Sequence, residues 1–284
     1  MSRSGFGGKT AKSVSSTSIG KQNVVDRSAG GDSLIRAIGG SEVAAWLDAD
    51  DISVADGANV TAWTAKEGNG PSQNASTPRP PDFLLDGING KPAVNFTATG
   101  ECLQWAAGDL NSSDIPAVTV ASTSRSTVTG NDSGIVFELG TTNYHTVAGL
   151  IHAYSTDGGS ADRRMLIGIG GGGDDGFRLS TSERTPNIDN VMVGVYDRST
   201  SDDTLNGFIN SEPITPAVSV DKDRTDSFDF NGQVSNLGAR ANGGSVGLNG
   251  SIREIVIINR ALSDAEAFRL AKALMSNSGL TALI

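Results

Sequence analysis

Apolar positions along the chain come in short runs, separated by clusters of Gly, Asn, Asp, Ser and Pro. This pattern is typical of many short strands joined by turns. The run at residues 251–259 is apolar on both faces at its centre, Ile255–Ile258, which predicts a buried strand. Further apolar runs predict strands at residues 117–122, 134–139, 146–152, 165–169 and 191–196.

One segment, residues 263–276, has the pattern of a helix. Ser263 is followed three residues later by Glu266, a capping box in which each side chain satisfies a free backbone N–H at the helix start. An apolar stripe at helical spacing follows, formed by Ala267, Phe268, Ala271, Leu274 and Met275. We therefore expect a single substantial helix, lying against one edge of the sheets.

The buried strand and the helix after it resemble the C-terminal signature of the concanavalin A-like (laminin G-like) jelly rolls, in the form common in phage tail and other virion proteins. Three earlier segments are similar to the opening strands of that family: AWLDA at 45–49, VTAW at 60–63 and GKPAVNF at 90–96. Residues 191–197 and 205–213 resemble its central hairpin. The resemblance covers most of residues 41–284.

The resemblance implies an all-β fold in which two antiparallel sheets pack as a β-sandwich jelly roll with one short C-terminal helix. It assigns residues 41–284 to one such domain, and it says little about an activity because one fold serves many functions. The residues expected in its core are Trp46, Trp63, Phe96, Leu103, Ile255, Ile257 and Phe268.

Residues 1–40 differ in composition and are predicted to form an extended basic arm. They are rich in Gly and Ser with few large apolar residues, so they should not fold alone. Their six basic and two acidic residues give a charge of +4, whereas residues 41–284 carry 16 basic and 30 acidic residues, or −14. Such an arm can dock on an acidic partner, bind nucleic acid or be a leader without a role. We expect docking, and assign it to Arg3, Phe6, Lys9, Lys12, Lys21, Arg27 and Arg36.

The chain shows neither a targeting nor a membrane segment. It lacks the apolar run of about 7–15 residues that a signal peptide needs and the ~20 of a membrane span. Lectin-like sandwiches of the resembled family nevertheless usually act outside cells. A protein made in a host cytoplasm and released within a virion would act outside cells without a signal peptide. The expected partners are capsid or tail subunits and further copies of this chain, with no membrane contact.

Residues that could carry chemistry are few. His145 and His152 lie seven apart in a strand region, which favours structural roles over a shared metal. The segment from Gly170 to Gly176 contains Asp174 and Asp175 but lacks the pattern of a phosphate loop or an EF-hand, and is predicted to be a hairpin tip. The resemblance leaves open a structural calcium ion between aspartates there. Otherwise we assign no cofactor and no metal ligand.

An enzyme is not expected either. Retaining glycosidases on this architecture set two carboxylates about 5 Å apart, and the chain has no Glu-x-Asp-x-x-Glu pattern. The nearest candidates are Asp226 with Asp229, and Glu254. Glu254 alternates with Ile252 and Val256, so we expect a half-buried carboxylate paired with an arginine. No catalytic residue is assigned.

Carbohydrate binding stays open as an alternative. Sugar rings stack on exposed aromatic side chains, and aromatic residues are only 5% of this chain. The tryptophans match core positions of the resembled family, which leaves Tyr144, Tyr154 and Tyr196 as stacking platforms. A weak site repeated in an assembly would still hold glycans through avidity.

Together these observations favour a non-enzymatic virion structural protein, a capsid decoration or a tail or fibre component, docked by its N-terminal arm. The first alternative is a carbohydrate-binding adhesin module for host surface glycans. The second is a polysaccharide-degrading enzyme.

Overall fold

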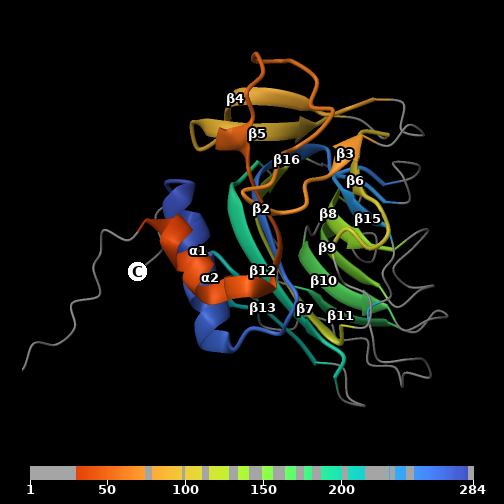
Figure 1. Ribbon diagram of the computed structural model, residues 1–284, viewed down its shortest axis with the longest axis vertical. Helices are drawn as coiled ribbons and strands as arrows, with labels where there is room; N and C mark the ends of the chain where they lie inside the picture. Colours follow the sequence, from red (N-terminus) through yellow and green to blue (C-terminus); the bar gives the residue numbers. More distant parts are fainter. Residues whose placement is uncertain are drawn as a thin grey trace, which may run out of the picture.

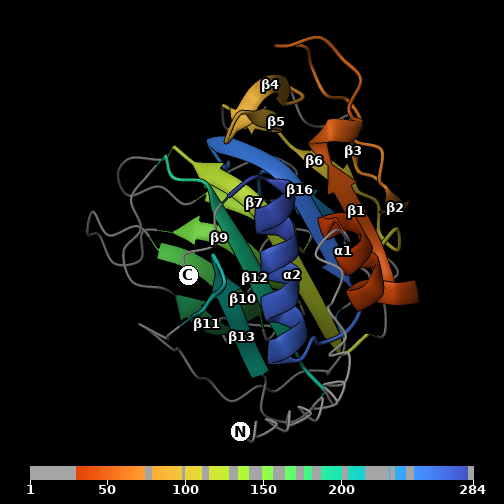
Figure 2. The same cartoon turned by 90° about the vertical axis from the view of Figure 1, so that its left-hand side faces the viewer.

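The computed structural model describes residues 30–73, 79–97, 100–110, 115–127, 134–140, 149–155, 164–170, 176–180, 187–199, 204–214, 230, 234–240 and 246–280. They form two antiparallel sheets packed face to face, with two helices on the outer side of the larger sheet (Figures 1 and 2). The expected all-β sandwich with a C-terminal helix is confirmed. Within these ranges, every helix is too short or too polar to cross a bilayer.

The larger sheet has nine strands, in the order β14-β13-β12-β7-β16-β1-β2, with β5 and β4 attached through β16. Its central strand β16 is buried on both faces, as its apolar pattern predicts. The strands are β1 (Val43–Asp48), β2 (Glu67–Gly68), β4 (Asp82–Ile88), β5 (Lys91–Phe96), β7 (Ala117–Ser126), β12 (Asn190–Asp197), β13 (Thr204–Ile209), β14 (Glu212–Pro213) and β16 (Gly250–Ile258).

The smaller sheet has seven strands, in the order β11-β10-β9-β8-β15-β6-β3. They are β3 (Ser72–Gln73), β6 (Leu103–Trp105), β8 (Gly134–Leu139), β9 (Leu150–Ser155), β10 (Arg164–Gly170), β11 (Gly176–Ser180) and β15 (Ser235–Leu237). The strand predicted at 146–152 overlaps β9 only in its last residues, and residues 146–148 lie outside the described ranges.

Helix α2 (Asp264–Asn277) begins with the predicted capping box of Ser263 and Glu266. The expectation of a single substantial helix is wrong, because α1 (Gly31–Gly39) forms within the segment predicted to be an extended arm. Short 3₁₀ turns follow at η1 (Gly40–Glu42) and η2 (Ala49–Asp51). A nine-residue helix is marginal alone, and α1 is stabilised because it buries Ile35 and Ile38 in the core shared with α2.

Two cores hold these layers together. One lies between the sheets and contains Trp63, Phe96, Leu103, Ile255 and Ile257. The other lies between the larger sheet and the helices, and contains Trp46. The expected core residue Phe268 is instead 39% exposed. It stands at the rim of α2, where its ring meets the Phe208 ring with centroids 6.3 Å apart.

Both faces of the larger sheet are therefore covered, one by the smaller sheet and one by the helices (Figure 1). Among the described residues, no helix or strand covers the outward face of the seven-stranded sheet.

Candidate functional site

A row of polar side chains crosses the outward face of the seven-stranded sheet. Gln104 of β6 is directly opposite Asn236 of β15, and Asn236 is opposite Glu138 of β8. Their strand neighbours Leu103 and Leu237 enter the core between the sheets. Because side chains alternate along a strand, Gln104, Asn236 and Glu138 face outward together. We call these three residues, with Arg240, the polar row.

Hydrogen bonds hold the polar row in place. Gln104 Nε2 donates to Asn236 Oδ1 at 2.9 Å, and Asn236 Nδ2 donates to the Gly140 carbonyl at 3.2 Å. Arg240 Nε donates to Glu138 Oε1 at 3.0 Å. Glu138 and Asn236 are buried, whereas Gln104 and Arg240 are partly exposed. Buried polar groups are stable only with partners, so the two buried members fix the orientation of the two that reach the surface.

Beside the polar row lies a small apolar cluster of Ile135, Ile151 and Ala153, with Val246 packed against it. Ile151 of β9 is directly opposite Glu138 of β8 in the strand register. Ile135, Ile151 and Ala153 are buried, so the groups on this face that can contact a ligand are the partly exposed amide of Gln104 and guanidinium of Arg240.

Sequence reasoning did not find the polar row. Its signal is visible in three short segments in which one polar residue stands between two neighbours that the sheet turns inward: LQW at 103–105, FEL at 137–139 and SNL at 235–237. The segments lie far apart in the chain, and only the strand pairing brings them side by side.

The tyrosines expected to be sugar platforms are not on the surface where the structure describes them. Tyr154 and Tyr196 lie in the core between the sheets, where their hydroxyls bond to Ser124 and to the Ile151 carbonyl. This corrects the prediction, because a strand residue that points inward cannot stack on a ligand. Tyr144 lies outside the described residues.

Most residues assigned to the docking arm also lie outside the described residues: Arg3, Phe6, Lys9, Lys12, Lys21 and Arg27. Arg36 belongs to α1, pairs with Glu67, and lies with its guanidinium 5.1 Å from the centre of the Trp46 ring. Its interactions are therefore within the fold. His145, Asp174, Asp175, Asp226 and Asp229 are outside the described ranges too.

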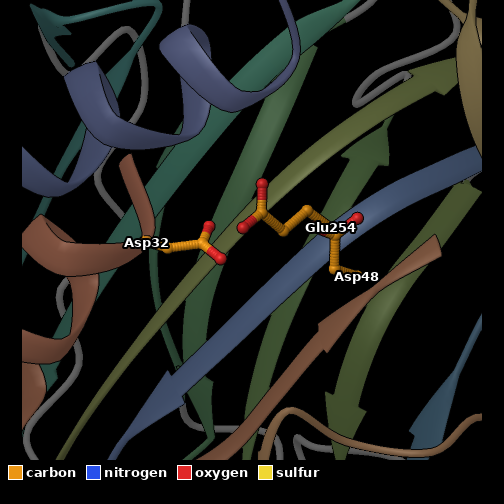
Figure 3. A group of neighbouring side chains, drawn as sticks. All are labelled: Asp32, Asp48 and Glu254. Carbon is orange, nitrogen blue, oxygen red and sulfur yellow. The ribbon is translucent and has the colours of Figure 1, made fainter. Parts of the chain in front are cut away.

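A second group of polar side chains lies on the other side of the molecule, between the helices and the larger sheet. Asp32 of α1, Asp48 of β1 and Glu254 of β16 each place one carboxylate oxygen within 4.8 Å of the others. Figure 3 shows the Asp32 and Glu254 carboxyl groups pointing toward one another, with Asp48 beside Glu254. We call these three residues the carboxylate cluster.

Glu254 differs from its prediction as a half-buried carboxylate paired with an arginine. It is 0% exposed, and its Oε1 accepts hydrogen bonds from Trp46 Nε1 at 2.9 Å and Asn277 Nδ2 at 3.0 Å. The strand has a bulge between Ile252 and Glu254. The bulge interrupts the alternation, so Ile252 faces the core between the sheets while Glu254 faces the helices. Burial, and next the nearby charge of Asp48, raise the pKa of Glu254 to about 8.

The sequence did not predict three carboxylates so close together, and two carboxylates near each other are also what a retaining glycosidase needs. Asp48 and Glu254 are nevertheless buried at the base of the helices, where a polysaccharide chain cannot reach them. The cluster therefore gives no support to glycosidase chemistry.

No family model and no curated protein matches the chain. The receptor binding domain of botulinum neurotoxin type G is similar over 82% of this chain and 51% of that chain, with a TM-score of 0.52 and 10% identity. Trypanosoma rangeli sialidase is similar over 83% of this chain and 33% of that chain, with a TM-score of 0.51 and 13% identity. The CBM40 module of Ruminococcus gnavus IT-sialidase covers 76% of this chain and 97% of that module, with a TM-score of 0.44 and 13% identity.

The aligned part is thus about half of the neurotoxin domain and a third of the Trypanosoma rangeli sialidase. At such low identities the similarity shows a shared fold, and it agrees with the lectin-like jelly roll that the sequence resembles. None of the three names refers to a virion protein.

Proposed function

We propose that the chain is a non-enzymatic carbohydrate-binding β-sandwich, and that the polar row on the seven-stranded sheet contacts the glycan. The observation that carries this proposal is the row of Gln104, Asn236 and Glu138 across three paired strands, on the face that no described helix or strand covers. Gln104 and Arg240 are its partly exposed members, so they are the groups that meet sugar hydroxyls.

A single site of this kind binds weakly. All three tryptophans are buried, and stacking on exposed rings supplies much of the affinity of strong sugar sites. Several copies displayed together can raise the overall affinity by about 10²–10⁴ through effective concentration. The binding is therefore expected on glycan-coated surfaces and not with free monosaccharides.

The comparisons guide the choice of probes. One Trypanosoma rangeli sialidase structure is a complex with 2,3-difluoro-KDN, an acidic sugar derivative. Acidic and neutral glycans therefore both belong in the test. The similarity shows only the fold, so the polar row remains the support for a glycan site in this chain.

The test is a glycan array probed with a multivalent form of the protein. We expect wild-type protein to bind a subset of glycans, and Gln104→Ala to lose that binding because its side-chain amide is removed. The matched control is Asn206→Ala on β13 of the other sheet, which also removes a partly buried amide that bonds to another side chain, Asp264. The control should bind as wild type. Absence of binding by wild type, or full binding by Gln104→Ala, contradicts the proposal.

Docking in a virion remains a prediction from the basic composition of residues 1–40. A deletion that tests it should end at residue 29, because Ile35 is buried in the helix core and Arg36 pairs with Glu67. We expect the shortened protein to fold and to lose its place on the particle. Particle occupancy equal to that of the full chain contradicts the docking hypothesis.

A further inference from the structure

The carboxylate cluster carries more negative charge than its neighbours cancel. Lys66 Nζ donates to Asp32 Oδ2 at 3.1 Å and to Asp48 Oδ2 at 2.8 Å, so it balances one of the three carboxylates. Lys66 is the only lysine or arginine among the described residues that forms an ion pair with Asp32. With Glu254 ionised, two negative charges remain within a partly buried space.

The guanidinium groups nearby are engaged elsewhere. Arg253 Nη2 lies 3.5 Å from Asp48 Oδ1, but its close partner is Asp50 Oδ2 at 2.6 Å. Arg36 on α1 pairs with Glu67 of β2. Neither of these ion pairs includes Glu254.

An independent observation comes from the second oxygen of Glu254. Oε1 accepts from Trp46 and Asn277, but Oε2 has no hydrogen-bond partner in the described part of the chain, and its side chain is fully buried. A buried carboxylate oxygen without a donor costs free energy. The carboxyl group reaches between Asp48 and Asp32 (Figure 3), so its environment is suited to a positive ligand.

The spacing of the cluster permits one calcium ion bound to all three carboxylates. Two oxygens on opposite sides of a calcium ion are about 4.6–5.2 Å apart, because each Ca–O bond is 2.3–2.6 Å. Magnesium demands near-ideal octahedral geometry and keeps several of its waters, so three carboxylates fixed by the fold suit it less well than calcium. The three oxygens all lie within 4.8 Å of one another, so a single calcium ion can contact all of them. The Asp32 side chain is 48% exposed, which provides an entry path.

We propose that Asp32, Asp48 and Glu254 bind one calcium ion, with water completing its coordination and Lys66 remaining beside it. The three ligands come from α1, β1 and β16. The ion therefore fixes α1, the first described element of the chain, to the sandwich. This proposal is independent of carbohydrate binding on the opposite face.

The test uses the full-length protein, first freed of metal with a chelator, then titrated with CaCl₂ or MgCl₂ by isothermal calorimetry and thermal unfolding. We expect one calcium site and a rise in Tm of roughly 2–4 °C or more at saturation, with a smaller effect of magnesium. Glu254→Gln should abolish the calcium response, and Asp32→Asn should weaken binding about tenfold or more. Glu212→Gln on the exposed strand β14 is the control and should respond as wild type.

Asp32→Asn keeps the test decisive if Glu254→Gln does not fold, because Asp32 is half exposed and its loss disturbs no core packing. Wild-type protein without any calcium response overturns the proposal. So does calcium binding of wild-type affinity in Asp32→Asn or Glu254→Gln. If the wild-type protein does not respond to calcium and Glu254→Gln has a higher Tm than wild type, the proposal is also wrong. That result shows that a proton on Glu254, and not a bound ion, satisfies the cluster.

Discussion

At the scale of single residues, burial decides what a titratable group can do. His152 lies in the core between the sheets, with Nε2 3.0 Å from Ser122 Oγ and Nδ1 3.2 Å from the Tyr196 hydroxyl. Loss of water lowers its pKa to about 3. A neutral imidazole offers one donor and one acceptor, which the two hydroxyl groups can match. His152 is therefore a structural residue, as its isolated position in the sequence indicates.

This burial makes the stability of the fold depend on pH. Unfolded histidine has a pKa of about 6.5, so below that value the unfolded chain binds a proton that the folded chain excludes. The free energy of unfolding should fall as pH decreases from 6.5, by at most about 1.4 kcal/mol per pH unit from this residue. His152→Gln should show a shallower slope between pH 6.5 and 4.5 in urea unfolding. Equal slopes in the two proteins contradict this account.

At the scale of elements, strong local patterns predict structure and tertiary packing decides the rest. The strand β16 and the helix α2 with its capping box follow from local sequence. Helix α1 does not follow from local sequence, because it is short and has glycines at both ends. It is stable only because its apolar side chains pack against α2. The polar row depends on strand register, and the carboxylate cluster on the bulge before Glu254, neither of which a single sequence specifies.

Because α1 packs closely on α2, we expect a Gly→Ala substitution in α1 to destabilise the fold, although this substitution usually stabilises a helix. Gly→Ala usually stabilises a helix by about 0.5–1 kcal/mol. At Gly31 the added methyl would overlap Asn277 Oδ1 and lie 2.7 Å from the Ala273 carbonyl oxygen. We expect Gly31→Ala to lower the free energy of unfolding by about 1–3 kcal/mol, measured by urea unfolding.

The neighbouring Gly30→Ala is the control, because nothing lies within 4 Å of its added methyl. Gly30→Ala should lower the free energy of unfolding only because Gly is preferred over Ala at the helix start, by less than about 1 kcal/mol. If Gly31→Ala is neutral or stabilising, the close contact between α1 and α2 is wrong.

At the scale of the whole molecule, the layers separate two kinds of site. The helices and the larger sheet enclose the carboxylate cluster, where a small ion fits and a glycan does not. The seven-stranded sheet carries the polar row on its outward face. The chain can therefore use one side for its own cohesion and the other for recognition, which is the central claim of this account.

The most direct measurement of that claim is a titration of isotope-labelled protein with a glycan selected on the array, followed by NMR. We predict that the signals that shift belong to β6, β8 and β15, including the side-chain amides of Gln104 and Asn236, while those of α1 and α2 stay in place. Shifts confined to the helices, or none on the seven-stranded sheet while the glycan binds, would contradict it.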